Sequence, residues 1–199
     1  KTPVTVDATL FRPGSISKLF TWTAVMQLVE QGKLNLDQDI NSYLDFRIPA
    51  TFPQPITLRH ILTHTTGFEE NLSHLFIQED VPLVSLKEYL PRHIPLRIFP
   101  PGTTPAYSNY GATLAGYIVE RISGQPFDQY IAGQILKPLG MTRSTFSQPL
   151  NAELKPLMSK GYEEGSGKAQ PFEVVQAAPA GSLSTTAADL SRFMIAHLQ

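Results

Sequence analysis

A run of apolar residues at helical spacing over positions 15 to 31 constrains the fold of this chain most strongly. Pro13 and Gly14 stand directly before it and force a sharp entry of the backbone, and Gly32 supplies a stop at the other end. The spacing predicts a buried helix with Ser15 at its exposed start. The apolar positions of this helix are Leu19, Phe20, Trp22, Val25, Met26, Leu28 and Val29.

Ser15 and Lys18 lie three residues apart in the first turn of this predicted helix. Residues at positions i and i+3 of a helix share a face, so the hydroxyl and the amine can reach hydrogen-bonding distance. The free amides and the positive dipole end of the first turn favour negative charge on the serine oxygen. The pair is a candidate nucleophile and base. Serine is also a favoured helix cap, and S-x-x-K occurs about once per 200 residues by chance, so the pattern needs support from elsewhere.

A second polar pair, Tyr107 and Asn109, stands at the start of another apolar stretch, residues 109–123. This Y-x-N segment places a phenol and a carboxamide two positions apart just before a predicted helix. Taken alone, it is typical of a turn followed by an asparagine cap. Together with Ser15 and Lys18, it supplies a second group of side chains suited to proton transfer and substrate binding.

Four segments resemble motifs of the serine β-lactamase and penicillin-binding protein superfamily, in particular its class C, D-aminopeptidase and esterase branch. In the order of that family, they are residues 15–18, 57–67, 107–109 and 179–186. The second segment resembles LLTHTSG with Thr66 in place of serine, and the fourth resembles AGGLxST with Ser182 in place of the second glycine. Four motifs in the family's order are a far stronger signal than either pair alone.

The resemblance implies a role for each candidate site residue. Ser15 would attack a carbonyl carbon and form an acyl-enzyme, Lys18 and Tyr107 would share its proton, and Tyr107 would activate water for deacylation. Asn109 would bind a substrate amide and orient Lys18. The ordinary pKa values of lysine, about 10.4, and tyrosine, about 10, are too high for an efficient base at neutral pH, so both must be lowered. Two such neighbours titrate as a coupled unit, and the sequence leaves open which one is the base.

The resemblance also implies the architecture. We expect an α/β protein, mostly α in this segment, with the β-lactamase/transpeptidase-like fold: a helical lobe plus an incomplete antiparallel sheet. Residues 1–199 would form a single partial catalytic domain that lacks the N-terminal strands and the C-terminal strand with the family's third motif. As a piece of a longer enzyme it would be inactive alone, because one oxyanion-hole donor is missing. The family further implies a periplasmic or extracellular location, although no signal peptide is visible.

Three functions remain open from the sequence. The first is a serine hydrolase acting on D-amino-acid peptides or β-lactams, and the second is a carboxylesterase that uses the same residues. The third is a non-catalytic receptor or scaffold for a cell-wall ligand. We expect a small-molecule or peptide substrate and no cofactor or metal, and the oligomeric state stays open. His60 and His64 lie one helical turn apart, but Ile61 stands where a zinc-binding H-E-x-x-H motif needs glutamate, which favours structural roles for both histidines.

Composition excludes several other classes of protein. The formal net charge of -1 at pH 7 offers no basic surface for nucleic acid. The sequence contains no run of about 18 apolar residues, so no segment of it is expected to span a membrane. The absence of cysteine excludes disulfides, thiol catalysis and cysteine zinc sites.

Helical spacing, capping residues and short apolar stretches predict the remaining elements. They are helices at 57–67, 85–89, 109–123 and 125–136, a final helix that starts with a capping box of Thr186 and Asp189, and strands at Phe146 and 172–175. One side of the final helix carries Leu190, Phe193, Met194 and Leu198.

Overall fold

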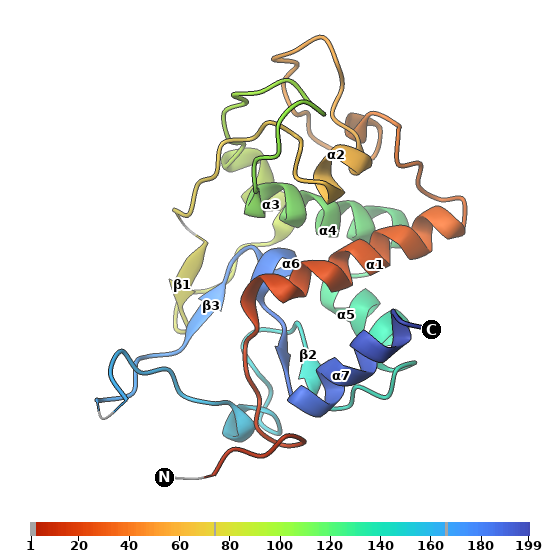
Figure 1. Cartoon of the computed structure of the whole chain (residues 1–199). Coiled ribbons are helices and arrows are strands. Elements are labelled where there is room, and N and C mark those ends of the chain that lie inside the picture. The colour runs from red at the N-terminus through yellow and green to blue at the C-terminus, as the bar shows by residue number, and fades with distance from the viewer. Residues whose placement is uncertain (1–2, 74, 166) are drawn as a thin grey trace.

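The computed structural model describes residues 3–73, 75–165 and 167–199. Two long helices, α1 (Ser17–Glu30) and α4 (Asn109–Ser123), pack against each other at its centre (Figure 1). In the described part of the chain, no helix has both the length and the apolar character that crossing a membrane requires. The shorter helices are α2 (Leu58–Leu62), α3 (Leu86–Arg92), α5 (Phe127–Ile131), α6 (Ala178–Gly181) and α7 (Ala187–Ala196), with single turns at Gly14–Ile16 (η1), Ile40–Ser42 (η2), Ala132–Leu136 (η3) and Lys155–Leu157 (η4).

Two small antiparallel sheets lie beside the helices (Figure 1). β1 (Phe76–Gln78) pairs with β3 (Glu173–Val175), so that the first residue of β1 faces the last residue of β3. β2 (Ser144–Thr145) pairs with β4 (Ser184–Thr185) in the same sense. Both sheets join segments that are far apart in the sequence, and β4 brings the 179–186 segment beside the start of α1.

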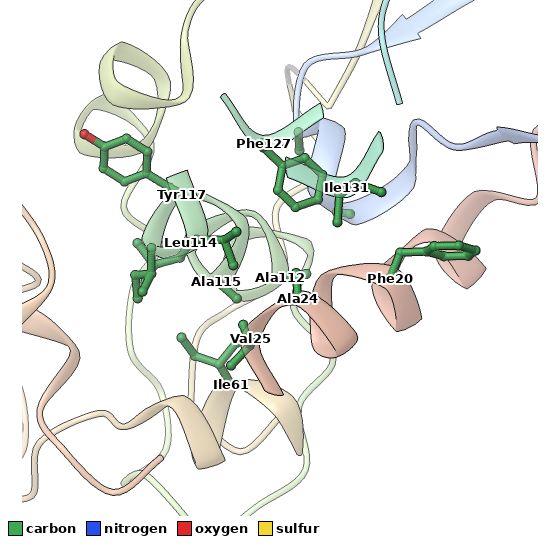
Figure 2. Close-up of a cluster of buried hydrophobic side chains, with 14 of the residues drawn as sticks. Phe20, Ala24, Val25, Ile61, Ala112, Leu114, Ala115, Tyr117, Phe127 and Ile131 are labelled. Carbon is green, nitrogen blue, oxygen red and sulfur yellow. The ribbon is translucent and has the colours of Figure 1, made fainter. Parts of the chain in front are cut away.

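The central core is formed where α1 meets α4 (Figure 2). Ala24 and Val25 of α1 lie opposite Ala112 and Ala115 of α4, and all four side chains are fully buried. Small side chains on the facing surfaces let the two helix axes approach closely. As a result, the first turns of α1 and α4, which carry the candidate site residues, are held in a fixed relation.

Gly116 allows α6 to pack directly on α4. A Cβ atom at this position would lie 2.3 Å from Cγ of Pro179, so the contact requires a residue without a side chain. On its other side α6 contacts α1, where the Thr21 hydroxyl donates to the carbonyl of Pro179 at 2.8 Å. The close approach brings the backbone of α6 to the N-terminal half of α1.

The helix predicted at residues 15–31 is confirmed, with a change at its start. The 3-10 turn η1 precedes α1, and Gly14 at its start adopts a φ of +58°. The expectation that the whole apolar set is buried is wrong for Leu19 and Met26, which are 50% and 44% exposed. These two positions share a face of the helix roughly opposite Ala24, and therefore point away from α4.

Three of the other predicted helices have different ends in the structure. The helix expected at 57–67 is α2 and stops at Leu62, because His64 leaves the helical conformation with a φ of +53°. The helix expected at 85–89 is α3 and continues to Arg92. The segment 125–136 divides into α5 and the π-helical turn η3.

The two helices with clear terminal signals start and end close to where the sequence places them. α4 has the predicted bounds, with the Ser108 hydroxyl accepting from the Gly111 N–H at 3.0 Å and Gly124 at a φ of +70°. Thr186 caps α7 by accepting the Asp189 N–H at 3.1 Å. The predicted capping box is wrong in its second half, because the Asp189 carboxylate does not turn back to the Thr186 N–H. It accepts from the Ser144 hydroxyl at 2.9 Å.

The apolar side expected for α7 is only partly correct. Phe193 is buried, and its ring stacks on Phe20 with the centroids 3.8 Å apart. Met194 is 60% exposed, and Leu198, which lies beyond the end of α7, is 85% exposed. The strand predicted at 172–175 is β3, whereas Phe146 lies just after β2.

Candidate active site

Ser15 is an exposed residue in the η1 turn. The chain before it is anchored to β4, because Phe11 and Thr185 exchange two backbone hydrogen bonds of 2.9 Å. Two side chains donate to the serine oxygen: the Tyr107 hydroxyl at 2.6 Å and Lys18 Nζ at 3.1 Å. Ser15 Oγ therefore has two neighbours that could accept its proton in their deprotonated forms.

Lys18 is 4% exposed and surrounded by oxygen acceptors. Its Nζ donates to Ser15 Oγ at 3.1 Å, to Asn109 Oδ1 at 2.7 Å and to the backbone carbonyl of Ala180 at 2.8 Å. Nζ also lies 4.8 Å from the centroid of the Tyr107 ring. An ammonium group has three hydrogens to donate, so the three acceptors satisfy it fully despite its burial.

The electrostatic environment of Lys18 favours loss of its proton. Burial lowers the pKa of the ammonium below its ordinary value, because it removes the charge from water. Contacts with Tyr107 and the negative charge of Glu70 act in the opposite direction, but burial has the larger effect on this pKa. The neutral amine, which can accept a proton from Ser15, is therefore available at lower pH than for a lysine in water.

Tyr107 lies in a segment that His64 holds on both sides. The carbonyl of His64 accepts the Ala106 N–H at 2.7 Å, and its Nδ1 accepts the Ser108 N–H at 3.2 Å. The imidazole and phenol rings lie 4.6 Å apart. An accepting Nδ1 requires a neutral imidazole with its proton on Nε2. Burial and the charge of Lys18 lower the pKa of His64, and both effects favour that neutral form.

Asn109 is the first residue of α4 and is 9% exposed. Its Oδ1 faces Lys18, while Glu70 lies on its other side. The Glu70 carboxylate accepts the backbone N–H of Asn109 through Oε2 and the Nδ2–H through Oε1, both at 2.8 Å. The carboxamide thus connects the lysine to a carboxylate from the loop after α2.

The segment 179–186 contributes backbone groups to the site. Besides the Ala180 carbonyl on Lys18, the Leu183 N–H donates to the Ser17 hydroxyl at 3.1 Å. Ser17 in turn donates to the carbonyl of Gly14 at 2.6 Å, which braces the turn that carries the serine. This segment therefore fixes both the turn and the amine.

The structure brings the four predicted site residues together: Ser15, Lys18, Tyr107 and Asn109 lie within one hydrogen-bonded cluster. Sequence reasoning missed the Ala180 carbonyl, because a backbone acceptor leaves no mark on residue type. It also missed Glu70, which sits among other polar residues without a motif. The sequence did indicate a structural role for His64, although its contact with the Tyr107 segment was not anticipated.

The histidine pair does not resemble a metal site. His60 Nδ1 accepts the Thr57 N–H at 3.2 Å at the start of α2, and His64 Nδ1 accepts from Ser108. In residues 3–73, 75–165 and 167–199, there is no group of three or more potential metal ligands.

A cavity of about 550 Å³ lies away from the serine cluster. Phe11 and residues 170–173 form part of its wall, and Ser15 does not line it.

Comparison with known proteins identifies the family. The sequence model described as Beta-lactamase matches residues 1–199. The chain belongs to the beta-lactamase family. The resemblance carried by the four motifs is thereby confirmed.

Other beta-lactamase-like proteins align with most of the chain. It is 30% identical to "Penicillin-binding protein 4" of Amycolatopsis lactamdurans over 207 residues, which cover 98% of the chain and 52% of that protein. The crystal structure of D-amino acid amidase from Ochrobactrum anthropi SV3, complexed with L-phenylalanine amide, has a TM-score of 0.81 and 25% identity over 100% of the chain and 57% of its own.

A second solved structure supports the same fold. The "Beta-Lactamase/D-Alanine Carboxypeptidase" from Pseudomonas syringae has a TM-score of 0.78 and 27% identity, covering 99% of this chain and 53% of its own. The predicted β-lactamase/transpeptidase-like fold is therefore confirmed. The chain spans about half the length of the curated beta-lactamase-family relatives it matches.

Proposed function

We propose that this chain carries the nucleophilic site of a serine hydrolase, in which Ser15 forms an acyl-enzyme with D-amino-acid peptides or β-lactams. One observation carries the proposal: Lys18 Nζ and the Tyr107 hydroxyl both donate to Ser15 Oγ, at 3.1 and 2.6 Å. The relatives named as penicillin-binding protein, β-lactamase and D-amino acid amidase support this substrate class.

Acylation of Ser15 would begin with attack of its Oγ on the carbonyl carbon of the substrate amide. The hydroxyl proton passes to the pair formed by Lys18 and Tyr107, and the backbone N–H of Ser15 stabilises the oxyanion. When the C–N bond breaks, the departing nitrogen takes a proton from the same pair. The acyl group stays on Oγ as an ester.

Deacylation would use the same proton acceptors. Tyr107 takes a proton from an attacking water, the ester C–O bond breaks, and Ser15 Oγ recovers its proton from the pair. Asn109 has two roles in this scheme. Its Oδ1 orients Lys18, and its Nδ2 carries a second hydrogen, besides the one on Glu70, that can bind a substrate carbonyl.

The test is the intact mass of the natural full-length protein after exposure to benzylpenicillin and, separately, to a fluorophosphonate. We expect one adduct per molecule with each reagent, located at Ser15 by peptide mapping and abolished by Ser15→Ala. A fluorophosphonate adduct with neither a penicillin adduct nor hydrolysis of penicillin would favour a carboxylesterase over the amide-directed hydrolase. A folded protein that reacts with neither reagent would overturn the proposal and leave the receptor or scaffold.

A further inference from the structure

We propose that Glu70 is a positioning residue for this reaction: its carboxylate fixes the orientation of the Asn109 carboxamide, and thereby the placement of the Lys18 amine against Ser15. The inference rests on the proposed function for its catalytic consequence. Its structural part, the control of Asn109 by Glu70, can be tested without any activity.

The contacts of Asn109 explain why only one orientation of its carboxamide is compatible with both neighbours. A carboxylate only accepts hydrogen bonds and an ammonium only donates them. Nδ2 therefore has to face Glu70, and Oδ1 has to face Lys18, as the distances of 2.8 and 2.7 Å record. A flipped carboxamide would place oxygen against carboxylate and NH₂ against ammonium.

The bond from the Asn109 backbone N–H to Glu70 Oε2 adds a second constraint. This N–H belongs to the first turn of α4, where backbone donors have no partner within the helix. One carboxylate thus holds both the main chain and the side chain of Asn109. Such a bidentate contact determines direction as well as distance.

Glu70 is itself held by a tightly packed loop. Gly67 has a φ of +78°, and a Cβ atom there would lie 1.9 Å from the carbonyl oxygen of Phe99. The next two residues pair with the segment before Phe99. Phe68 and Arg97 form an isolated antiparallel β-bridge, and the Glu69 N–H donates to the Leu96 carbonyl at 2.8 Å. The close approach at Gly67 therefore fixes the backbone from which Glu70 reaches Asn109.

Glu70 also contributes charge to the proton-transfer site. The titratable groups that interact with Lys18 are Tyr107, His64 and Glu70, and Glu70 supplies a negative charge that favours the ammonium. Removing this charge lowers the pKa of Lys18 further. The pH at which the rate of Ser15 acylation reaches half of its maximum should therefore move to lower pH.

Glu70→Gln is the informative substitution, because it keeps the shape of the side chain but turns one acceptor into a donor. The two hydrogen bonds from Asn109 go to different oxygens of Glu70, and the carboxamide introduced at position 70 has an NH₂ group in place of one of them, so one Asn109 donor would face another donor. We expect the rate of penicillin acylation of the full-length protein to fall by about tenfold to a hundredfold, the usual effect of losing a charge-assisted hydrogen bond. Glu69→Gln, at the exposed neighbouring position, is the matched control and should leave rate and pH profile unchanged.

A compensating pair separates positioning from a general effect on folding. In Asn109→Asp alone, two carboxylates face each other. Adding Glu70→Gln restores a matched contact. The NH₂ group introduced at position 70 can donate to the carboxylate introduced at position 109, and its oxygen can accept the backbone N–H of residue 109. The other carboxylate oxygen at position 109 still faces Lys18. The double variant should therefore acylate at least about tenfold faster than Asn109→Asp, a coupling that independent substitutions would not show.

The structural part is read from the ¹H–¹⁵N resonances of the Asn109 backbone and side chain. Both should shift in Glu70→Gln and stay in place in Glu69→Gln. The proposal is overturned if these signals do not respond to Glu70→Gln, or if that variant acylates with the wild-type rate and pH profile. A wild-type protein that neither forms an adduct at Ser15 nor hydrolyses penicillin would contradict the proposed function instead. The resonances would then still test whether Glu70 holds Asn109.

Discussion

Burial lowers the pKa of Lys18 in the folded chain, whereas its hydrogen bonds to three protein oxygens stabilise the ammonium form. The same contacts serve two purposes. They place Nζ beside Ser15 Oγ, and they make the charged form tolerable inside the protein. A residue so arranged links the reactivity of the site to the stability of the fold.

This link predicts how stability depends on pH. Between the lowered pKa of Lys18 in the folded chain and about 10.4 in the unfolded chain, only the unfolded chain still binds the proton. The free energy of unfolding of wild type should therefore rise with pH relative to Lys18→Met. Urea unfolding of both proteins at several pH values up to about 10 measures this difference.

Lys33→Met supplies the control, because Lys33 is exposed just after α1. Its stability difference from wild type should stay flat over the same range. A flat difference for Lys18→Met as well would show that the folded and unfolded chains hold this proton equally.

At the scale of helices and strands, local signals predicted some elements and tertiary contacts decided others. α4 follows from its apolar residues and a terminal glycine, which are local signals, although Ser108 and not Asn109 caps it. β1 and β4 are three and two residues long and pair with partners far along the sequence, so no local pattern marks them. The site divides in the same way: S-x-x-K and Y-x-N are local patterns, whereas Glu70 meets Asn109 only in the fold.

The contact between α4 and α6 gives a prediction at this scale. Gly116→Ala would place a methyl group against the Pro179 ring, and we expect a loss of about 1 to 3 kcal/mol in the free energy of unfolding. Since α6 also carries the Ala180 carbonyl, acylation of Ser15 should slow as well. Urea unfolding and the penicillin adduct rate measure the two effects.

Gly133→Ala is the matched substitution. Gly133 also lies in a helical turn, but in the described structure its added methyl group would meet no atom within 4 Å outside its own turn and chain neighbours. It should leave the acylation rate unchanged and alter stability by less than about 1 kcal/mol. Equal losses in the two variants would contradict the close packing of α6 on α4.

At the scale of the whole chain, the surface carries apolar side chains on two neighbouring helices. The exposed side chains are Leu19 and Met26 of α1, Met194 of α7, and Leu198 just after α7. The helices meet where the Thr23 hydroxyl lies 3.5 Å from His197 Nε2. Exposed apolar side chains that gather on one side of a protein promote association.

Residues 1–199 made as a separate chain should therefore associate at micromolar concentration. Sedimentation velocity should show species larger than the monomer, and the combined variant Met26→Lys and Met194→Lys should shift the distribution toward monomer. Val4→Lys with Val6→Lys is the control, because these valines are as exposed but lie in the N-terminal segment. A chain that sediments as a monomer without substitution would show that this surface does not associate.

The third acceptor of the Lys18 amine is the main-chain oxygen of Ala180, and this has a consequence for how the site can be altered. Every amino-acid substitution, including those of a full mutational scan, keeps this carbonyl oxygen. A substitution can therefore change the contact with Lys18 only by moving the backbone. A protein made by chemical ligation, with the amide after Ala180 replaced by an ester, would weaken this acceptor and remove the Gly181 N–H while leaving every side chain in place. One of the groups that control the proton of Lys18 is thus determined by the path of the backbone and not by the type of a side chain.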